Sequence, residues 1–150
     1  MQLTQHTDFG LRLLIVLARN DEAIALPSFA AQQGLSYNHV AKVAQALVHE
    51  GFAVSRRGRN GGITLARPAA DIRVGDVVRK LERGMRLADC ANCALKHDCA
   101  LSSILAEALA AFMAVLDRYS LADVAREGTP AFAPWAMLPA VPTCAVTAPS

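Results

Sequence analysis

Three cysteines lie close together in the segment Cys90-Ala-Asn-Cys-Ala-Leu-Lys-His-Asp-Cys99, although the chain of 150 residues has four in all. A Cys-x2-Cys-x5-Cys spacing lets a loop wrap around a metal centre. A tetrahedral zinc site with His97 as the fourth ligand is one interpretation. Thiolates are also the preferred ligands of iron–sulfur clusters, so the spacing alone leaves both metals open.

The rest of the chain favours reduced thiols. The N-terminus lacks the features of a signal peptide, and Arg12 and Glu107 interrupt the two richest apolar runs before either could span a bilayer. We therefore expect a cytoplasmic protein without a membrane partner, in which a structural disulfide is disfavoured. A thioredoxin-like redox pair is also disfavoured, because no βαβ pattern surrounds the cysteines.

Basic residues are concentrated in one part of the chain. Residues 51–86 contain nine of the 15 Lys and Arg residues but three acidic ones. Such an excess is typical of a phosphate-binding surface, although a solvated charged face gives the same pattern. The composition is 53% hydrophobic but 5% aromatic, which favours helices built from Ala, Leu and Val.

Apolar periodicity predicts the elements that position these residues. Residues 4–19 are expected to form a helix. Ser28 is expected to cap a short helix over residues 28–33, Gly34 to end it, and Ser36 to cap a second helix that ends near residue 50. Two short helices around a glycine fit either a helix-turn-helix or an ordinary αα-hairpin.

The segment that follows favours DNA binding. Residues 52–55 and 63–66 read as strands around a basic, glycine-rich tip at 56–62, which makes the whole unit a winged helix-turn-helix. A nucleotide-binding P-loop is disfavoured, because its lysine and its strand–loop–helix context are absent. We predict base contacts and backbone contacts to DNA from these residues: Ser36, Tyr37, Asn38, His39, Lys42, Arg56, Arg57, Arg59, Asn60 and Gly61.

The C-terminal half is expected to be helical and then irregular. Residues 72–83 form an amphipathic helix, and residues 101–119 form a long helix whose broad apolar stripe has little remaining chain to cover it. We therefore predict a homodimer packed through this long helix, the alternative being that it folds back on its own winged helix. A short helix at 121–126 and a disordered tail with five prolines over 128–150 complete the chain.

These motifs resemble one family. The N-terminal MQLTQHTDFGLR, the recognition-helix segment YNHVAKVAQALVHEGF, the segment RRGRNGGITLARPAADIRVGDVVRKLE and the three cysteines are similar to the NsrR family, nitric-oxide-sensing iron–sulfur repressors related to IscR. The resemblance covers about residues 1–127. It implies a homodimeric transcriptional repressor, not an enzyme, that binds a palindromic operator in double-stranded DNA and responds to nitric oxide.

The resemblance also implies a ligand set. Family members hold their cluster through three cysteines, which match Cys90, Cys93 and Cys99, and those with a 4Fe–4S cluster take an aspartate of the other subunit as fourth ligand, which matches Asp8. IscR-like members use a histidine at the position of Ser102. By this resemblance we expect a 4Fe–4S cluster. The first two cysteines stand closer together than in many members, which keeps 2Fe–2S as the alternative. Without the resemblance, Asp8 is interpreted as a carboxylate in the first helical turn that is stabilised by the helix dipole.

The expected organisation is therefore mainly α. A winged helix-turn-helix DNA-binding domain spans 1–84, a cluster-binding loop spans 85–100, a dimerisation helix region spans 101–127, and the tail spans 128–150. Cys144 in the tail is expected to be dispensable, and His6 and His97 to be surface residues. Two other functions stay open: an IscR-like regulator that senses iron or cluster supply, and a zinc-stabilised interaction module without DNA binding.

Overall fold

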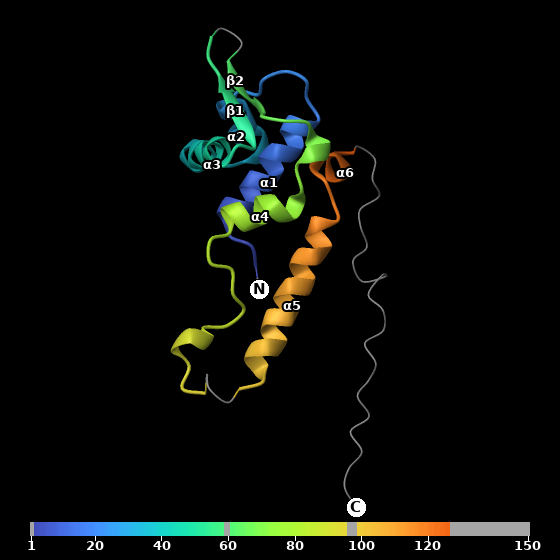
Figure 1. Cartoon of the computed structure of the whole chain (residues 1–150). Helices are drawn as coiled ribbons and strands as arrows, with labels where there is room; N and C mark the ends of the chain where they lie inside the picture. The colour runs from blue at the N-terminus through green and yellow to red at the C-terminus, as the bar shows by residue number, and fades with distance from the viewer. Residues whose placement is uncertain (1, 59–60, 96–98, 127–150) are drawn as a thin grey trace, which may run out of the picture.

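The computed structural model describes residues 2–58, 61–95 and 99–126. Its elements, in chain order, are α1 (Gln5–Ala18), α2 (Leu26–Gln33), α3 (Tyr37–His49), β1 (Ala53–Arg56), β2 (Gly62–Leu65), the 3-10 turn η1 (Ala69–Asp71), α4 (Val74–Leu81), the 3-10 turn η2 (Cys90–Asn92), α5 (Leu101–Asp117) and α6 (Leu121–Ala125). All elements but η2 and α5 form a head, from which α5 extends as an arm (Figure 1). The predicted fold class, mainly helical with a winged helix, is confirmed.

Several predicted features lie outside the described residues. They are the wing contacts Arg59 and Asn60, the donor candidate His97, and the tail over 128–150 with Cys144. Within the described ranges, no helix combines the length and the apolar character that crossing a membrane requires.

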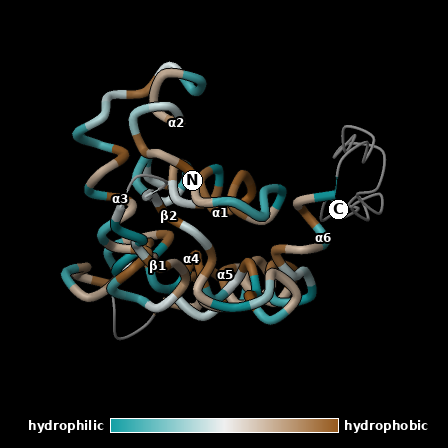
Figure 2. The backbone as a smooth tube through the Cα atoms, turned by 90° about the horizontal axis from the view of Figure 1, so that it is seen from above, coloured by the Kyte–Doolittle hydropathy of each residue, from teal (hydrophilic) through white to brown (hydrophobic). Residues whose placement is uncertain are grey.

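The head is built around α1. Its apolar spacing places Leu13, Leu14 and Leu17 on one buried face, and burial of each stabilises the fold by roughly 2 kcal/mol. Seen from above, α1 runs through the middle of the head with α3 on one side and α6 on the other (Figure 2). Thr4 caps the helix, because its hydroxyl accepts a hydrogen bond from the backbone N–H of Thr7.

The helix-turn-helix forms as predicted except at its two caps. Ser36 occupies the N-cap position of α3, but its side chain makes no capping hydrogen bond. The prediction that Ser28 caps α2 is wrong, because the helix already begins at Leu26 and Pro27 occupies its first turn. Proline suits that position, where a backbone N–H would have no partner in the helix. Gly34 ends α2 with φ +64°, a conformation that residues with a Cβ rarely adopt, and α3 begins directly after Ser36.

The wing is a two-stranded antiparallel hairpin in which Ala53 pairs with Leu65 and Arg56 with Gly62. Both strands are displaced by one residue from their predicted positions. Ile24, between α1 and α2, adds a bridge to Ile63 through two backbone hydrogen bonds of 2.9 Å. The wing is thereby fixed to the core rather than held by its turn alone.

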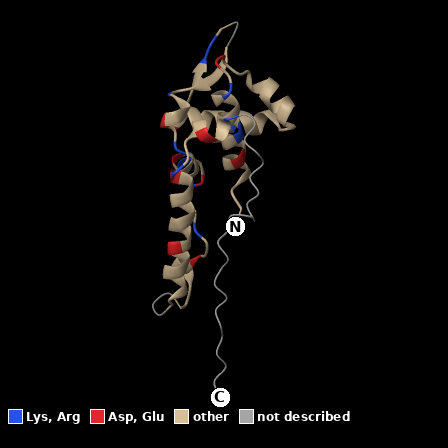
Figure 3. Ribbon diagram, turned by 90° about the vertical axis from the view of Figure 1, so that its right-hand side faces the viewer, with Lys and Arg blue, Asp and Glu red and all other residues tan. Residues whose placement is uncertain are grey.

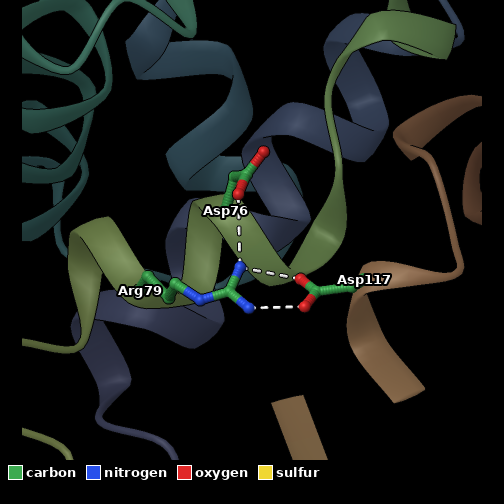
Figure 4. A network of polar contacts seen from close by, with 3 residues as sticks. All are labelled: Asp76, Arg79 and Asp117. Carbon is green, nitrogen blue, oxygen red and sulfur yellow. Dashed lines mark hydrogen bonds and ion pairs between the residues drawn. The ribbon is translucent and has the colours of Figure 1, made fainter. Parts of the chain in front are cut away.

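α5 meets the head through its C-terminal end. The guanidinium of Arg79 in α4 donates hydrogen bonds to both carboxylate oxygens of Asp117, at 2.7 and 2.5 Å, and also pairs with Asp76 at 3.2 Å (Figure 4). These bonds hold the pKa of Asp117 below its usual value. A Cβ on Gly75 would lie 1.9 Å from Asp117 Oδ1, so the close approach of the two helices depends on this glycine.

The remainder of α5 is not covered by the head. None of its 17 residues is fully buried, and Leu101, Ile104 and Val115 are 56%, 58% and 44% exposed. Apart from the end that meets α4, the helix does not fold back on its own winged helix (Figure 1). An apolar helix this exposed is typical of a helix that packs against a second subunit.

A second polar joint connects α1 to the end of α4. Glu82 accepts hydrogen bonds from the Thr4 backbone N–H at 3.1 Å, from the Thr4 hydroxyl at 2.9 Å, and from the hydroxyl of the fully buried Thr7. Burial raises the pKa of the Glu82 carboxyl, but the hydrogen bonds from Thr7 and Thr4 outweigh it, so the pKa lies below its usual value. These hydrogen bonds fix the first turn of α1 to the C-terminal end of α4, where the connection that contains the cysteines begins.

Thr7→Val should lower the free energy of unfolding by about 1–2 kcal/mol at pH 7, because a hydrogen bond to an ionised carboxylate is lost. The contribution of Glu82 is fully present above its unfolded pKa of about 4.3 and is lost as pH falls through the lower folded pKa. Urea unfolding at pH 7 and at pH 3 should show the penalty shrink. Thr64→Val is the matched control, because the buried Thr64 hydroxyl has no partner among the described residues; a similar penalty there would contradict the assignment.

Candidate nucleic-acid interface and cysteine loop

One face of α3 is free of the core. Val40, Val43, Ala44 and Leu47 are buried against the head, which leaves the predicted contact residues on the outside. Ser36, Tyr37, Asn38, His39 and Lys42 are all exposed. The arrangement gives an exposed polar and basic helix face of the kind that reads base edges in a major groove.

The wing continues this face. Arg56 and Arg57 are exposed at its end, and Gly61 closes the turn by donating its backbone N–H to the Gly58 carbonyl at 2.9 Å. Lys and Arg residues are drawn in blue on the hairpin in Figure 3. A groove of about 550 Å³ separates the wing from α3 and is lined by residues of both, including Tyr37, Gln45, Ser55 and Arg56. The predicted DNA contacts that fall on described residues therefore share one side of the head.

The three clustered thiols lie in the connection between α4 and α5. Cys90 and Cys93 bracket η2, with the backbone N–H of Cys93 donating to the Cys90 carbonyl at 3.4 Å, and all three thiols are free. Cys93 is exposed, and Cys90 and Cys99 are half-buried. The hydroxyl of Ser102 donates to the Cys99 carbonyl at 2.9 Å, so it serves the start of α5.

Asp8 lies on another part of the molecule. It sits in the first turn of α1 with 43% of its side chain exposed, and its carboxylate pairs with Arg12 at 2.8 Å. The cysteine segment is drawn at the far end of the α5 arm from the head that contains α1 (Figure 1). Within the described residues, no three His, Cys, Asp or Glu side chains gather closely enough to hold a metal ion.

The donor set nevertheless fits an iron–sulfur cluster. Three unpaired thiols on one connection offer the thiolate ligands that clusters and zinc both take. The candidate fourth donor Asp8 lies on the outside of the head, with 43% of its side chain exposed. The predicted ligands are therefore not brought together within one chain.

The comparisons with known proteins decide the family. A family model named Rrf2, described as an iron-dependent transcriptional regulator, matches residues 3–127. The chain belongs to the Rrf2 family. Rrf2 proteins are transcriptional regulators that bind DNA, rather than enzymes. Family membership supports regulator function over the zinc-stabilised module.

Solved Rrf2-like structures share most of this chain. CymR of Staphylococcus aureus in its oxidised form is 28% identical, covers 84% of this chain and 97% of its own, and superposes with a TM-score of 0.71. IscR of T. potens is 27% identical, covers 91% and 96%, and also has a TM-score of 0.71. CymR of B. subtilis, described as the global cysteine regulator of that organism, is 25% identical, covers 83% and 96%, and has a TM-score of 0.65.

Two polar joints of this Rrf2 chain escaped the sequence analysis. Glu82 and its partner Thr4 are 78 residues apart, and Arg79 and Asp117 are 38 apart. Pairs at such separations leave no periodicity to detect. The one local signal was a carboxylate, Glu82, directly after an apolar helix whose last turn should favour cations instead.

Proposed function

We propose that this Rrf2 chain is a homodimeric transcriptional repressor whose operator binding is controlled by nitric oxide through an iron–sulfur cluster, with 4Fe–4S favoured over 2Fe–2S. The observation that carries the proposal is the division of the donors. Three free thiols stand on the α4–α5 connection and the candidate fourth ligand stands on the outside of α1. A site completed by a second chain makes the cluster a link between subunits.

Each residue has a distinct part in this proposal. Cys90, Cys93 and Cys99 of one subunit hold the cluster, and Asp8 of the partner subunit completes the ligand set. When bound, the cluster supplies iron that reacts with nitric oxide. The Asp8 carboxylate is a hard ligand beside soft sulfur donors, so it is the ligand most easily released. Arg12 gives the released carboxylate another partner, at the 2.8 Å distance seen in this chain.

Two sets of hydrogen bonds connect the position of Asp8 to the orientation of α5. Asp8 is one turn from Thr4, which Glu82 fixes to the end of α4, and Arg79 fixes α4 to Asp117 at the end of α5. Binding of Asp8 at the partner's cysteine loop therefore fixes the orientation of the head relative to α5. Because a dimer of this type binds half-sites about one helical turn apart, release of Asp8 changes the spacing of the two recognition helices.

A shift from nearly full to nearly empty operators requires a differential affinity of about 10⁴ between the two states. When the two heads no longer match the half-site spacing, only one head at a time can bind its half-site. The loss of simultaneous binding supports a difference in affinity of that order. The genes released from repression are those for nitric oxide detoxification, by the resemblance to NsrR.

Anaerobic purification tests the proposal. We expect a brown protein with iron and sulfide in equal amounts, whose visible absorbance bleaches on stoichiometric nitric oxide while operator binding is lost. A colourless protein that contains zinc, or one whose operator binding ignores nitric oxide, would refute it. The amount of iron per chain together with a Mössbauer spectrum distinguishes 4Fe–4S from 2Fe–2S.

The IscR-like function, control by iron or cluster supply, is the second candidate. It is favoured by the similarity to IscR of T. potens and by the description of the family as iron-dependent. Against it, the position of the IscR-like histidine ligand is Ser102, whose hydroxyl is engaged with the Cys99 carbonyl. Operator binding that depends on cluster occupancy but not on nitric oxide would favour this second candidate.

Arg57→Ala in the wing should weaken binding to all duplexes alike, because Arg57 is exposed and placed to neutralise a phosphate. The slope of log K against log salt should fall by about 1.8 for the dimer, which is about 0.9 for each subunit. Fluorescence anisotropy over a salt series measures both effects. Arg118→Ala, an exposed arginine at the end of α5, is the control, and an unchanged slope for Arg57→Ala would contradict the role of the wing.

A further inference from the structure

A small cavity of about 180 Å³ lies where the first turn of α1 meets the start of α3. Two of its lining residues, His39 and Lys42, are among the predicted DNA contacts, but the proposed function gives no role to its α1 side. The cavity is named here the α1–α3 pocket, and it is lined by Gln5, His6, Phe9, His39, Lys42 and Val43. The lining comes from the two helices that pack closely at the centre of the head. The pocket therefore adjoins both the helix that bears Asp8 and the helix that reads DNA.

The polar groups of the α1–α3 pocket suit an anion. Lys42 is a cation at neutral pH, and Gln5 and the two imidazoles of His6 and His39 can each donate an N–H. The first backbone N–H groups of α1 have no acceptor within the helix, and they form the positive end of its dipole. None of the described residues that line the pocket is acidic.

The nearest carboxylates are already engaged. Asp8 pairs with Arg12, and Glu82 accepts three hydrogen bonds from Thr4 and Thr7. The side chains of Gln5, His39 and Lys42 are exposed, and no hydrogen bond or ion pair joins them to any residue in the described ranges. Gln5, His39 and Lys42 are thus available to a ligand from outside the chain, whereas His6 already interacts with the charge of Glu82.

The position of the pocket selects the ligand. The groove lined by Tyr37, Gln45 and Arg56 flanks α3 on the side of the wing, and the α1–α3 pocket flanks it through His39 and Lys42 on the side of α1. A helix in a major groove has a sugar–phosphate backbone on each side. The wing serves one of these backbones, which leaves the other for the first turn of α1.

We propose that the α1–α3 pocket binds a phosphate of the DNA backbone on the side of the recognition helix away from the wing. The inference rests on the proposed function, in which α3 enters the major groove. It gives Asp8 a direct route to DNA. The backbone N–H of Asp8 donates to the Thr4 carbonyl at 3.0 Å, so the carboxylate that leaves the cluster sits in the same helical turn as the phosphate donors.

Gln5→Glu separates this role from a structural one. A carboxylate in the first turn of a helix favours the dipole, so the thermal stability of the protein should stay the same or rise. The same carboxylate repels a phosphate in the pocket, so affinity for operator and for non-specific duplex should fall about tenfold, and the salt slope by about 1.8 for the dimer. Ala70→Glu, an exposed site in η1, which packs against α6, controls for net charge.

Neutral phosphate analogues provide the second arm. A duplex is first isolated from a randomised pool by binding to the wild-type dimer, and methylphosphonate is then placed at single positions of its backbone. At one position per half-site, methylphosphonate should lower the affinity of the wild-type protein about as much as Gln5→Glu does. The same replacement should change the affinity of the Gln5→Glu variant little. The inference would be overturned if the effects of Gln5→Glu and of methylphosphonate were additive at every position. It would also be overturned if the affinity difference between the two proteins depended on inorganic phosphate in the buffer rather than on the DNA backbone. Either result leaves the proposed function intact. Failure to isolate any duplex would overturn both.

Discussion

Cys93→Ser should yield a colourless protein after anaerobic purification, with iron content at least about 100-fold below that of the wild type. Cys93 is exposed and unpaired, and its thiolate is one of three that the α4–α5 connection can offer to a cluster. Since the site is distant from the core of the head, the melting temperature of the cofactor-free protein should not change. Iron and sulfide analysis, visible absorbance and operator binding measure the effect.

Cys144→Ser is the matched control, because it removes a thiol that is not among the proposed ligands. If Cys144→Ser keeps its full iron content while Cys93→Ser contains none, the loss of iron is due to the loss of a cluster ligand and not to the removal of a thiol in general. Equal iron content in the two variants would contradict the assignment of Cys93 as a ligand.

The same variant tests whether Asp8 acts across the dimer. In a mixed dimer of one Asp8→Ala chain and one Cys93→Ser chain, ligation across subunits leaves one complete site, formed by the cysteines of the first chain and Asp8 of the second. Ligation within one chain leaves none. A cluster content of about half that of the wild type is therefore expected, and an empty mixed dimer would show that Asp8 is not shared between subunits.

Ile104→Asp should dissociate the dimer. Ile104 is 58% exposed in the single chain and lies on the apolar face of α5, where burial against a partner would strand a charge in each subunit. At a cost of about 2 kcal/mol per subunit, the dissociation constant of the dimer rises about 10³-fold. Sedimentation equilibrium should report the mass of one chain, while circular dichroism reports an intact head, because α5 contributes no fully buried residue to it.

Ala110→Asp provides the comparison on the same helix. Ala110 is exposed and lies three residues after Glu107, on the stripe of α5 that already carries a charge. The same new charge there should leave the mass of the dimer unchanged. A dimer that survives Ile104→Asp would place the subunit interface elsewhere and would remove α5 from the proposed mechanism.

The local elements of this protein were determined by the sequence. The spacing of Leu13, Leu14 and Leu17 predicted α1, and Gly34 marked the turn of the helix-turn-helix, because periodicity and backbone conformation act over a few residues. The pair of short strands around a basic turn predicted the wing to within one residue. The cap of α2 was misplaced, since Ser28 is a good cap by type but Pro27 favours the first turn even more.

The tertiary structure decided how these elements are joined. Glu82 meets Thr4 and Thr7, and Arg79 meets Asp117, between segments whose approach no short-range pattern encodes. The α1–α3 pocket likewise needs two helices in contact before Gln5 and Lys42 share one space. Sequence spacing could group three thiols as candidate ligands, because they lie within one connection. It could not bring Asp8 to them, because that distance is set by packing, and in a single chain the packing keeps them apart.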